Sequence, residues 1–176
     1  MAYAKHFGCI DKYYTPFLSL HKEKEFNHKE RQEVLPENNK GLHVVPQVLT
    51  NSAADFLKVA HTLKELGYTE VNINLGCPSG TVVPKGKGAG LLAEPARLEQ
   101  FLEGCFEKTP VRISIKTRLG MEEEEEWEKL LAIYSRFPLE ELIVHARVRE
   151  DYYKNPVRLE AFGSALDKSK CSVCYN

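Results

Sequence analysis

Apolar, β-branched runs alternate along the chain with longer segments in which apolar residues recur at helical spacing. The runs predict six strands, at residues 10–17, 43–49, 70–75, 111–116, 141–145 and 171–175. Because strands that alternate with helices usually pair in parallel, this order predicts an α/β protein. The sequence contains no internal repeat and no linker that would divide it into domains.

Four of the intervening segments predict helices with recognisable ends. They are expected at residues 52–66, 95–106, 122–137 and 156–166. Asn51 or Ser52 caps the first helix, which stops at Gly67, and Pro95 stands at the first position of the second. The acidic run at residues 122–126 is expected in the first turn of the third helix, where the helix dipole favours carboxylates.

The remaining segments bear on the fold class. Residues 21–40 are polar and predict a partly helical surface excursion, and residues 1–7 resemble the last turns of a helix. Six strands are too few for a complete eight-stranded barrel of ~250 residues. We therefore expect an incomplete (β/α)8 TIM barrel with about six parallel strands and intervening helices. The pattern alone also allows a doubly wound open sheet.

The composition narrows the class of protein. With 176 residues, 43% hydrophobic and 28% charged, the chain is neither disordered nor fibrous. Its formal net charge of −1 gives no overall basic signal, so binding to a polyanion would depend on a local cluster of Lys and Arg. No apolar run approaches the ~20 residues that span a bilayer. No signal segment follows Met1, so a cytoplasmic location without membrane attachment is expected.

The five cysteines are an odd number at irregular spacing, which does not predict a disulfide framework. Cys171 and Cys174 form a C-x-x-C pair, a spacing that also occurs in metal and redox sites. No second pair and no clustered His accompanies it. We interpret both residues as strand residues facing the core, and we expect no metal site.

Polar side chains follow four successive predicted strands, at the point where each strand ends. They are Gln47, Asn74, Cys77, Lys116, Arg118, His145 and Arg147. Catalytic groups of parallel barrels lie at the carboxyl ends of the strands, so these residues are expected to share one site. A single such residue would more often be a cap or a surface contact, but four consecutive strand ends indicate function.

Four short motifs resemble one enzyme family. Residues 72–78 read Asn-Ile-Asn-Leu-Gly-Cys-Pro, residues 85–92 read Lys-Gly-Lys-Gly-Ala-Gly-Leu-Leu, residues 114–120 read Ser-Ile-Lys-Thr-Arg-Leu-Gly, and residues 145–147 read His-Ala-Arg. In their order and separation they resemble the N-x-G-C-P, K-G-x-G, K-x-R-x-G and H-x-R motifs of the flavin-dependent tRNA-dihydrouridine synthases. Two tyrosines, at 152 and 153, follow where that family usually has one.

The resemblance implies an FMN-dependent reduction of the uracil 5,6 double bond in tRNA, with NADPH or NADH re-reducing the flavin. Cys77 would be the proton donor, because a thiol is mostly protonated at neutral pH. Lys116 and His145 would contact the pyrimidine edge of the flavin, and Gln47 would pair with its ring. Asn74 would pair with the uracil edge, since an amide offers both a donor and an acceptor.

Contacts with tRNA are expected from four cationic residues. Lys85 and Lys87 belong to a glycine-rich segment that lacks the spacing of a phosphate loop, and we expect them to approach RNA phosphates beside a flexible catalytic loop. The alternative is an ordinary solvated turn. Arg118 and Arg147 are expected to meet the RNA, or else to cover the rim of the site.

The resemblance also implies missing parts. Residues 1–176 are expected to form a partial TIM-barrel catalytic domain, without the family's first strand, its last strand and its C-terminal helical tRNA-binding domain. The isolated chain is then expected to self-associate through uncovered sheet edges and to bind FMN weakly, and its own activity is left open. Two alternatives stay open: a related flavin barrel that reduces free pyrimidines, and a catalytically silent chain that interacts with RNA.

Overall fold

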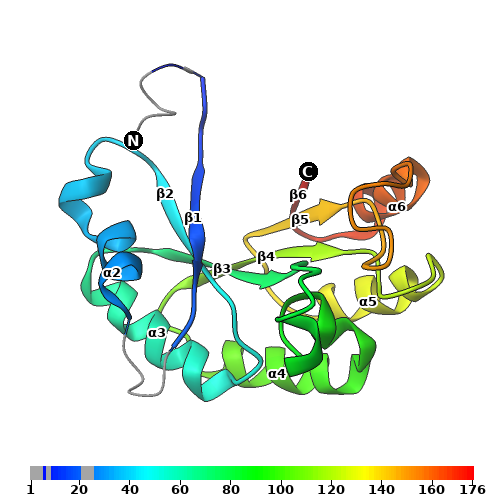
Figure 1. Cartoon of the computed structure of the whole chain (residues 1–176), viewed down its shortest axis with the longest axis horizontal. Coiled ribbons are helices and arrows are strands. Elements are labelled where there is room, and N and C mark those ends of the chain that lie inside the picture. The colour runs from blue at the N-terminus through cyan, green and yellow to red at the C-terminus, as the bar shows by residue number, and fades with distance from the viewer. Residues whose placement is uncertain (1–5, 7–8, 21–25) are drawn as a thin grey trace.

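A six-stranded parallel sheet organises the chain in the computed structural model, which describes residue 6 and residues 9–20 and 26–176. The strands are β1 (Tyr13–Leu18), β2 (Val44–Val48), β3 (Glu70–Leu75), β4 (Arg112–Arg118), β5 (Glu141–His145) and β6 (Ser172–Tyr175). They pair in the order β1-β2-β3-β4-β5-β6, every pair parallel (Figure 1). All six predicted strands are confirmed, with their ends shifted by a few residues.

From β1 onward, helices alternate with the strands, and those of the described residues lie on one side of the sheet (Figure 1). They are α2 (His28–Val34), α3 (Ala53–Glu65), α4 (Pro95–Glu107), α5 (Glu126–Tyr134) and α6 (Leu159–Lys168), with short 3-10 helices at Pro36–Asn39, Val83–Lys85 and Gly88–Ala93. The excursion expected at residues 21–40 is therefore partly helical over its described part. The helix end expected at residues 1–7 lies outside the described residues except for His6.

The predicted helix ends are confirmed for α3 and α4. The Ser52 side chain accepts a hydrogen bond from the backbone N–H of Asp55, and Pro95 is the first residue of α4. The prediction for α5 is wrong at its start, because that helix begins at Glu126 rather than at Glu122. The Glu126 carboxylate accepts hydrogen bonds from the backbone N–H groups of residues 121, 122 and 123, which holds the acidic run as a turn before the helix.

The strand order decides between the two folds that the pattern allowed. A doubly wound sheet reverses its strand order at a switch point, whereas this sheet adds each strand beside the preceding one. Successive helices also contact each other, α3 with α4, α4 with α5 and α5 with α6. This is the arrangement of an incomplete (β/α)8 barrel.

The two faces of the sheet differ in chemistry. In β3, Val71, Ile73 and Leu75 are buried in the hydrophobic core that the helices complete. Glu70 and Asn72 alternate with them on the inner face and are also buried. The inner face of β3 is therefore polar, while its outer face packs against helices.

Polar contacts cross the inner face and show that the sheet curls. Lys12 Nζ lies 3.2 Å from Glu70 Oε2 and 3.3 Å from Glu141 Oε2, and the Tyr14 hydroxyl donates to Glu141. Lys12 immediately precedes β1, and Glu141 begins β5, which is four strands away in the sheet. Burial lowers the pKa of Lys12, but hydrogen bonds and charge from both carboxylates outweigh it and raise that pKa above its usual value.

Candidate active site

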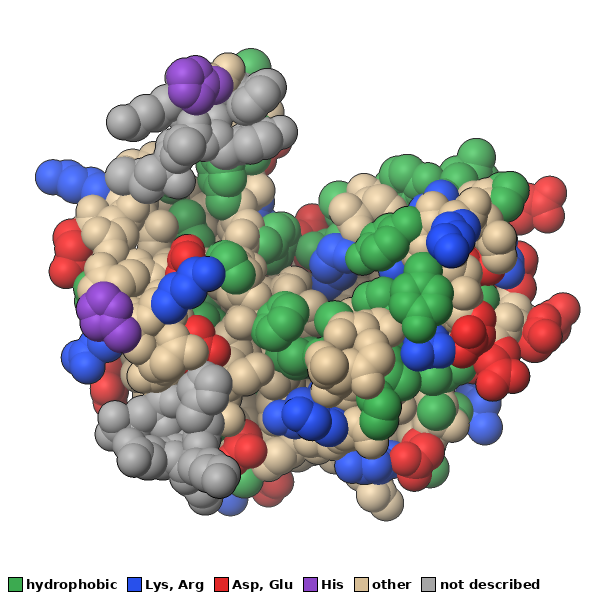
Figure 2. Space-filling model, viewed as in Figure 1, with side chains coloured by type: hydrophobic (Ala, Val, Ile, Leu, Met, Phe, Trp, Pro, Cys, Tyr) green, Lys and Arg blue, Asp and Glu red, His purple; other side chains and the backbone are tan. Residues whose placement is uncertain are grey.

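A cavity of about 680 Å³ opens at the carboxyl ends of the strands. Its lining includes all seven of the strand-end residues singled out from the sequence, together with Phe17, Gly76, Pro78, Tyr153, Val157, Tyr175 and Asn176. Phe17 and Tyr175 come from β1 and β6, the two ends of the strand order. Figure 2 shows the surface hollowed between the two upper parts of the molecule. The fold therefore brings the predicted residues together, except Lys85 and Lys87, which do not line the cavity.

The backbone around Cys77 is held by hydrogen bonds on both sides. Asn74 Oδ1 accepts from the N–H of Gly76, at 3.2 Å, and from the N–H of Cys77, at 2.9 Å. The Cys77 carbonyl in turn accepts from the N–H of Ala89, at 3.1 Å. Cys77 itself is half-buried in the cavity wall, so its thiol is presented from an anchored turn.

The Ala89 contact comes from the glycine-rich segment, which is a packing element against the Cys77 turn. Gly88 has a φ of +56°, and a Cβ built there would lie 2.8 Å from the Cys77 carbonyl oxygen and 2.9 Å from Cys77 Cβ. A Cβ at Gly90 would lie 2.4 Å from the Val83 carbonyl oxygen. These glycines permit a close approach of two backbones. Lys85 is exposed and Lys87 is half-buried.

A chain of side-chain amides runs beneath the cavity floor. Asn72 Nδ2 donates to Ser114 Oγ at 3.0 Å, Gln47 Nε2 donates to Asn72 Oδ1 at 2.8 Å, and Asn74 Nδ2 donates to Gln47 Oε1 at 2.8 Å. The backbone N–H groups bound to Asn74 Oδ1 can only donate, so they determine the orientation of every amide in the chain.

The amide chain limits what each group offers to a ligand. Asn74 Oδ1 already accepts two hydrogen bonds, so only one N–H of its amide is left. The expectation that Asn74 offers both a donor and an acceptor is therefore wrong in its second part. Gln47 retains one N–H and one oxygen lone pair. Sequence reasoning missed Asn72 and Ser114. Asn72 lies two residues before Asn74, and Ser114 lies two residues before Lys116, so each is on the same face of its strand as a predicted site residue, and this spacing was a signal.

Lys116 supplies a cation to the cavity wall. Burial and the neighbouring Arg118 lower the pKa of Lys116, and Cys77 and Cys174 offset part of that change. Within the described part of the chain no carboxylate forms an ion pair with it. A half-buried ammonium without a counter-charge gains stability when an anionic group binds beside it.

His145 lies next to three cations. Burial, followed by the charges of Arg118, Lys116 and Arg147, lowers the pKa of His145 to about 4, so the imidazole is neutral at neutral pH. Arg147 Nη1 lies 3.1 Å from His145 Nε2, and an arginine can only donate. Nε2 is therefore the acceptor and Nδ1 holds the proton.

The arginines of the site differ in their surroundings. Arg147 is half-buried, and its Nε donates to the Asn155 carbonyl oxygen. Arg118 is only 1% exposed and donates to backbone carbonyls, while the ring of Tyr153 lies over its guanidinium at 5.2 Å from the ring centroid. The RNA contact expected of Arg118 stays a prediction, and most of its donors already have protein partners.

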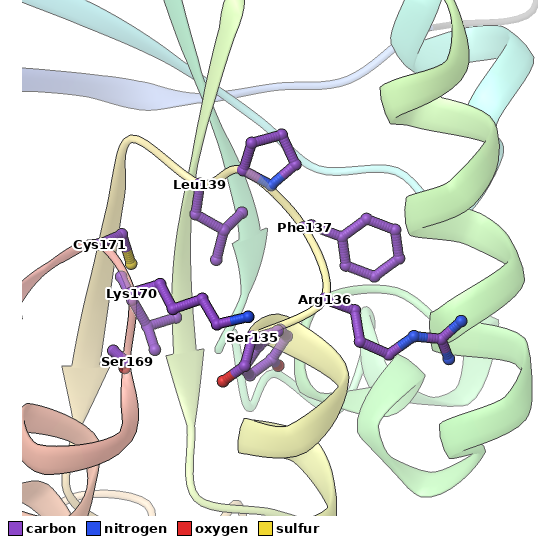
Figure 3. Close-up of a pocket in the computed structure, with 10 residues that line it drawn as sticks. Ser135, Arg136, Phe137, Leu139, Ser169, Lys170 and Cys171 are labelled. Atoms are coloured by element: carbon purple, nitrogen blue, oxygen red, sulfur yellow. The ribbon is translucent and has the colours of Figure 1, made fainter.

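A second cavity, of about 400 Å³, lies at the opposite end of the sheet, between the end of α5 and the segments that enter β5 and β6 (Figure 3). Its charged lining residues are Arg136 and Lys170. Figure 3 shows the Arg136 side chain turned toward α4, where it pairs with Glu99. This cavity has no carboxylate or imidazole in its lining.

The described residues contain neither a metal-binding cluster nor a helix suited to crossing a membrane. No group of three or more His, Cys, Asp or Glu side chains in those residues is placed to hold a metal ion. Cys171 packs against the core as expected, but Cys174 is exposed, so the expectation for the second cysteine is wrong. None of the helices in the same residues has the length and apolar character needed to cross a membrane.

Comparisons with known proteins agree on one family. Residues 3–176 match the family model described as Dihydrouridine synthase (Dus). The chain is 30% identical over 111 residues to a protein named probable tRNA-dihydrouridine synthase 2 from Bacillus subtilis (strain 168). The aligned region covers 63% of this chain and 34% of that relative. It is 30% identical over 128 residues to a probable tRNA-dihydrouridine synthase from Staphylococcus aureus (strain Mu50), covering 65% and 39%. The matches thus span little more than a third of these relatives.

Proposed function

The chain belongs to the dihydrouridine synthase family, and from this premise we propose that it provides catalytic residues of a tRNA-dihydrouridine synthase. The reaction is the reduction of the uracil 5,6 double bond in tRNA, in the cytoplasm, with NADPH or NADH as the reductant. Residues 1–176 act as part of its TIM-barrel catalytic domain. The observation that supports this most directly is the single cavity that joins Cys77, Lys116 and His145.

The cavity lining fits a flavin. When bound, reduced FMN supplies a hydride to one carbon of the uracil double bond. Lys116, a half-buried cation without an ion-pair partner in the described residues, would hold the pyrimidine edge, where negative charge resides. Gln47 would donate its free N–H to the ring, and the neutral His145 would add a polar contact at the same edge.

Cys77 completes the reduction as the acid. Its S–H bond breaks, the proton goes to the uracil carbon next to the one that receives the hydride, and the thiolate is reprotonated from water. Hydride and proton together account for the two hydrogens that the double bond gains. The turn that holds Cys77 also holds Asn74, whose remaining N–H would donate to a uracil carbonyl oxygen. Substrate and acid would thereby be oriented by one short segment.

The tRNA backbone would be met outside the cavity. Lys85 and Lys87 extend from the segment behind the Cys77 turn, and Arg147 lies on the cavity wall. We propose that these cations contact RNA phosphates.

The test is Cys77→Ala in the full-length protein. It should leave reduction of the flavin by NADPH or NADH intact, and should slow dihydrouridine formation by about 100-fold or more, because general acid catalysis is lost. Dihydrouridine is measured by digestion of the tRNA and mass spectrometry, and Cys105→Ala, in the buried face of α4, is the control for loss of a thiol. Equal dihydrouridine yields from the native protein and Cys77→Ala would remove Cys77 from the mechanism.

A further inference from the structure

Arg118 ends β4 at the cavity and is among the largest fully buried side chains of the described residues. A buried guanidinium needs its N–H groups satisfied, and an ion pair with a carboxylate is the usual arrangement. No carboxylate of the described chain lies within ion-pair distance of Arg118, although the charge of Asp151 offsets part of the effect of burial, which lowers the pKa of Arg118. Three of its N–H groups donate to the backbone instead. Nε donates to the Gly76 carbonyl at 2.9 Å, and Nη1 donates to those of Val148 at 3.0 Å and Tyr152 at 2.8 Å.

The three carbonyls belong to two loops that are far apart in sequence. Gly76 follows β3 and directly precedes Cys77, whereas Val148 and Tyr152 follow β5. The second loop also carries Tyr153, whose ring lies over the Arg118 guanidinium at 5.2 Å and meets the His145 ring edge-on at 5.7 Å between centroids. One side chain therefore contacts both loops, and residues from both loops line the cavity.

The second loop is held in a strained conformation at the point of contact. Tyr152 has a φ of +48°, in the left-handed region that residues other than glycine and asparagine rarely adopt. Such a conformation persists where surrounding contacts over-determine it, and it is common at functional sites. The Arg118 hydrogen bond to the Tyr152 carbonyl is one such contact, and the Tyr152 N–H bond to the Arg149 carbonyl is another.

We propose that Arg118 is a positioning residue, which fixes the Cys77 turn and the Tyr152–Tyr153 loop relative to each other across the cavity. The thiol of Cys77 and the ring of Tyr153 then keep one mutual placement. Only a planar guanidinium fork supplies donors in the directions of both loops, whereas a lysine offers a single nitrogen. The consequence for catalysis rests on the proposed function; the coupling of the two loops does not.

The loop coupling is tested by amide hydrogen exchange on this chain. Arg118→Met removes the fork and the charge, and Arg118→Lys removes the fork alone. In both variants the amides of residues 76 and 77 and of residues 148 and 152 should exchange about tenfold faster together, because charge-assisted hydrogen bonds that restrain both loops are lost. The matched control is Arg112→Met, which removes an exposed arginine at the other end of the same strand and should leave both loops unchanged.

Two further readouts separate positioning from general destabilisation and from RNA contact. Cys105 is fully buried, so iodoacetamide labels it only when the fold opens; its labelling rate should stay within twofold of the native rate in Arg118→Lys.

In the full-length enzyme, Arg118→Lys should lower kcat about tenfold or more and leave KM for tRNA within twofold. Faster exchange in neither loop or in one loop only, or a raised KM with unchanged kcat, would overturn the proposal. A native enzyme that forms no dihydrouridine would reject the proposed function while leaving the exchange result valid.

Discussion

His145 shows how burial and neighbouring charges set the chemistry of one residue. Burial, followed by the charges of three nearby cations, lowers its pKa to about 4 from the usual value near 6.5. The unfolded chain takes up a proton near pH 6.5 and the folded chain does so only near pH 4. Protonation therefore favours the unfolded state, and His145 lowers stability progressively as pH falls from about 6.5 to about 4.

We predict that His145→Gln loses this part of the pH dependence. The free energy of unfolding of the native chain, from urea titrations at pH 7, 5.5 and 4.5, should fall more steeply than that of the variant. His61→Gln, on the outer surface of α3, is the control and should follow the native curve. Parallel curves for the native chain and His145→Gln would show that burial and the nearby cations do not hold His145 neutral.

Lys116 and Lys87 are both lysines near the site, but their surroundings predict opposite roles. Lys116 lines the cavity, while Lys87 lies behind the Cys77 turn. Lys116→Ala should weaken FMN binding or slow its reduction by about tenfold or more, with little change in tRNA affinity. Lys87→Ala should weaken tRNA binding and leave the flavin unaffected. Flavin fluorescence titration and filter binding measure the two affinities, and a Lys116 variant that loses only tRNA affinity would reverse our assignment.

At the scale of elements, the glycine-rich segment and the Cys77 turn depend on each other. Gly88→Ala places a methyl group against the Cys77 carbonyl and Cβ, at a φ that disfavours any side chain. We expect it to cost about 2 kcal/mol of stability and to slow dihydrouridine formation in the full-length protein. Gly80→Ala is the matched control, since a Cβ there meets nothing within 4 Å. Equal urea midpoints and equal dihydrouridine rates for the two variants would show that the close approach is unimportant.

At the scale of the whole molecule, the strand order makes β1 and β6 the two edges of the sheet. Phe17 in β1 is 41% exposed and Tyr175 in β6 is 46% exposed, and edges with exposed apolar side chains favour pairing with another chain. We predict that this chain, prepared by itself, self-associates and binds FMN weakly. Light scattering after size exclusion and an FMN titration test this, and a monomer with micromolar FMN affinity would contradict it.

Periodicity alone determined the six strands, the main helices apart from the start of α5, and the cluster of polar residues at the strand ends. The alternation of apolar and polar residues is local, and parallel pairing then brings all strand ends to one side. Three things were decided only by the tertiary structure. The amide chain leaves Asn74 a single donor, Arg118 turns inward to two loops, and Lys12 bridges β3 and β5. Each depends on which groups meet across strands distant in sequence, because a polar side chain's free donors and acceptors are those its neighbours leave unbound.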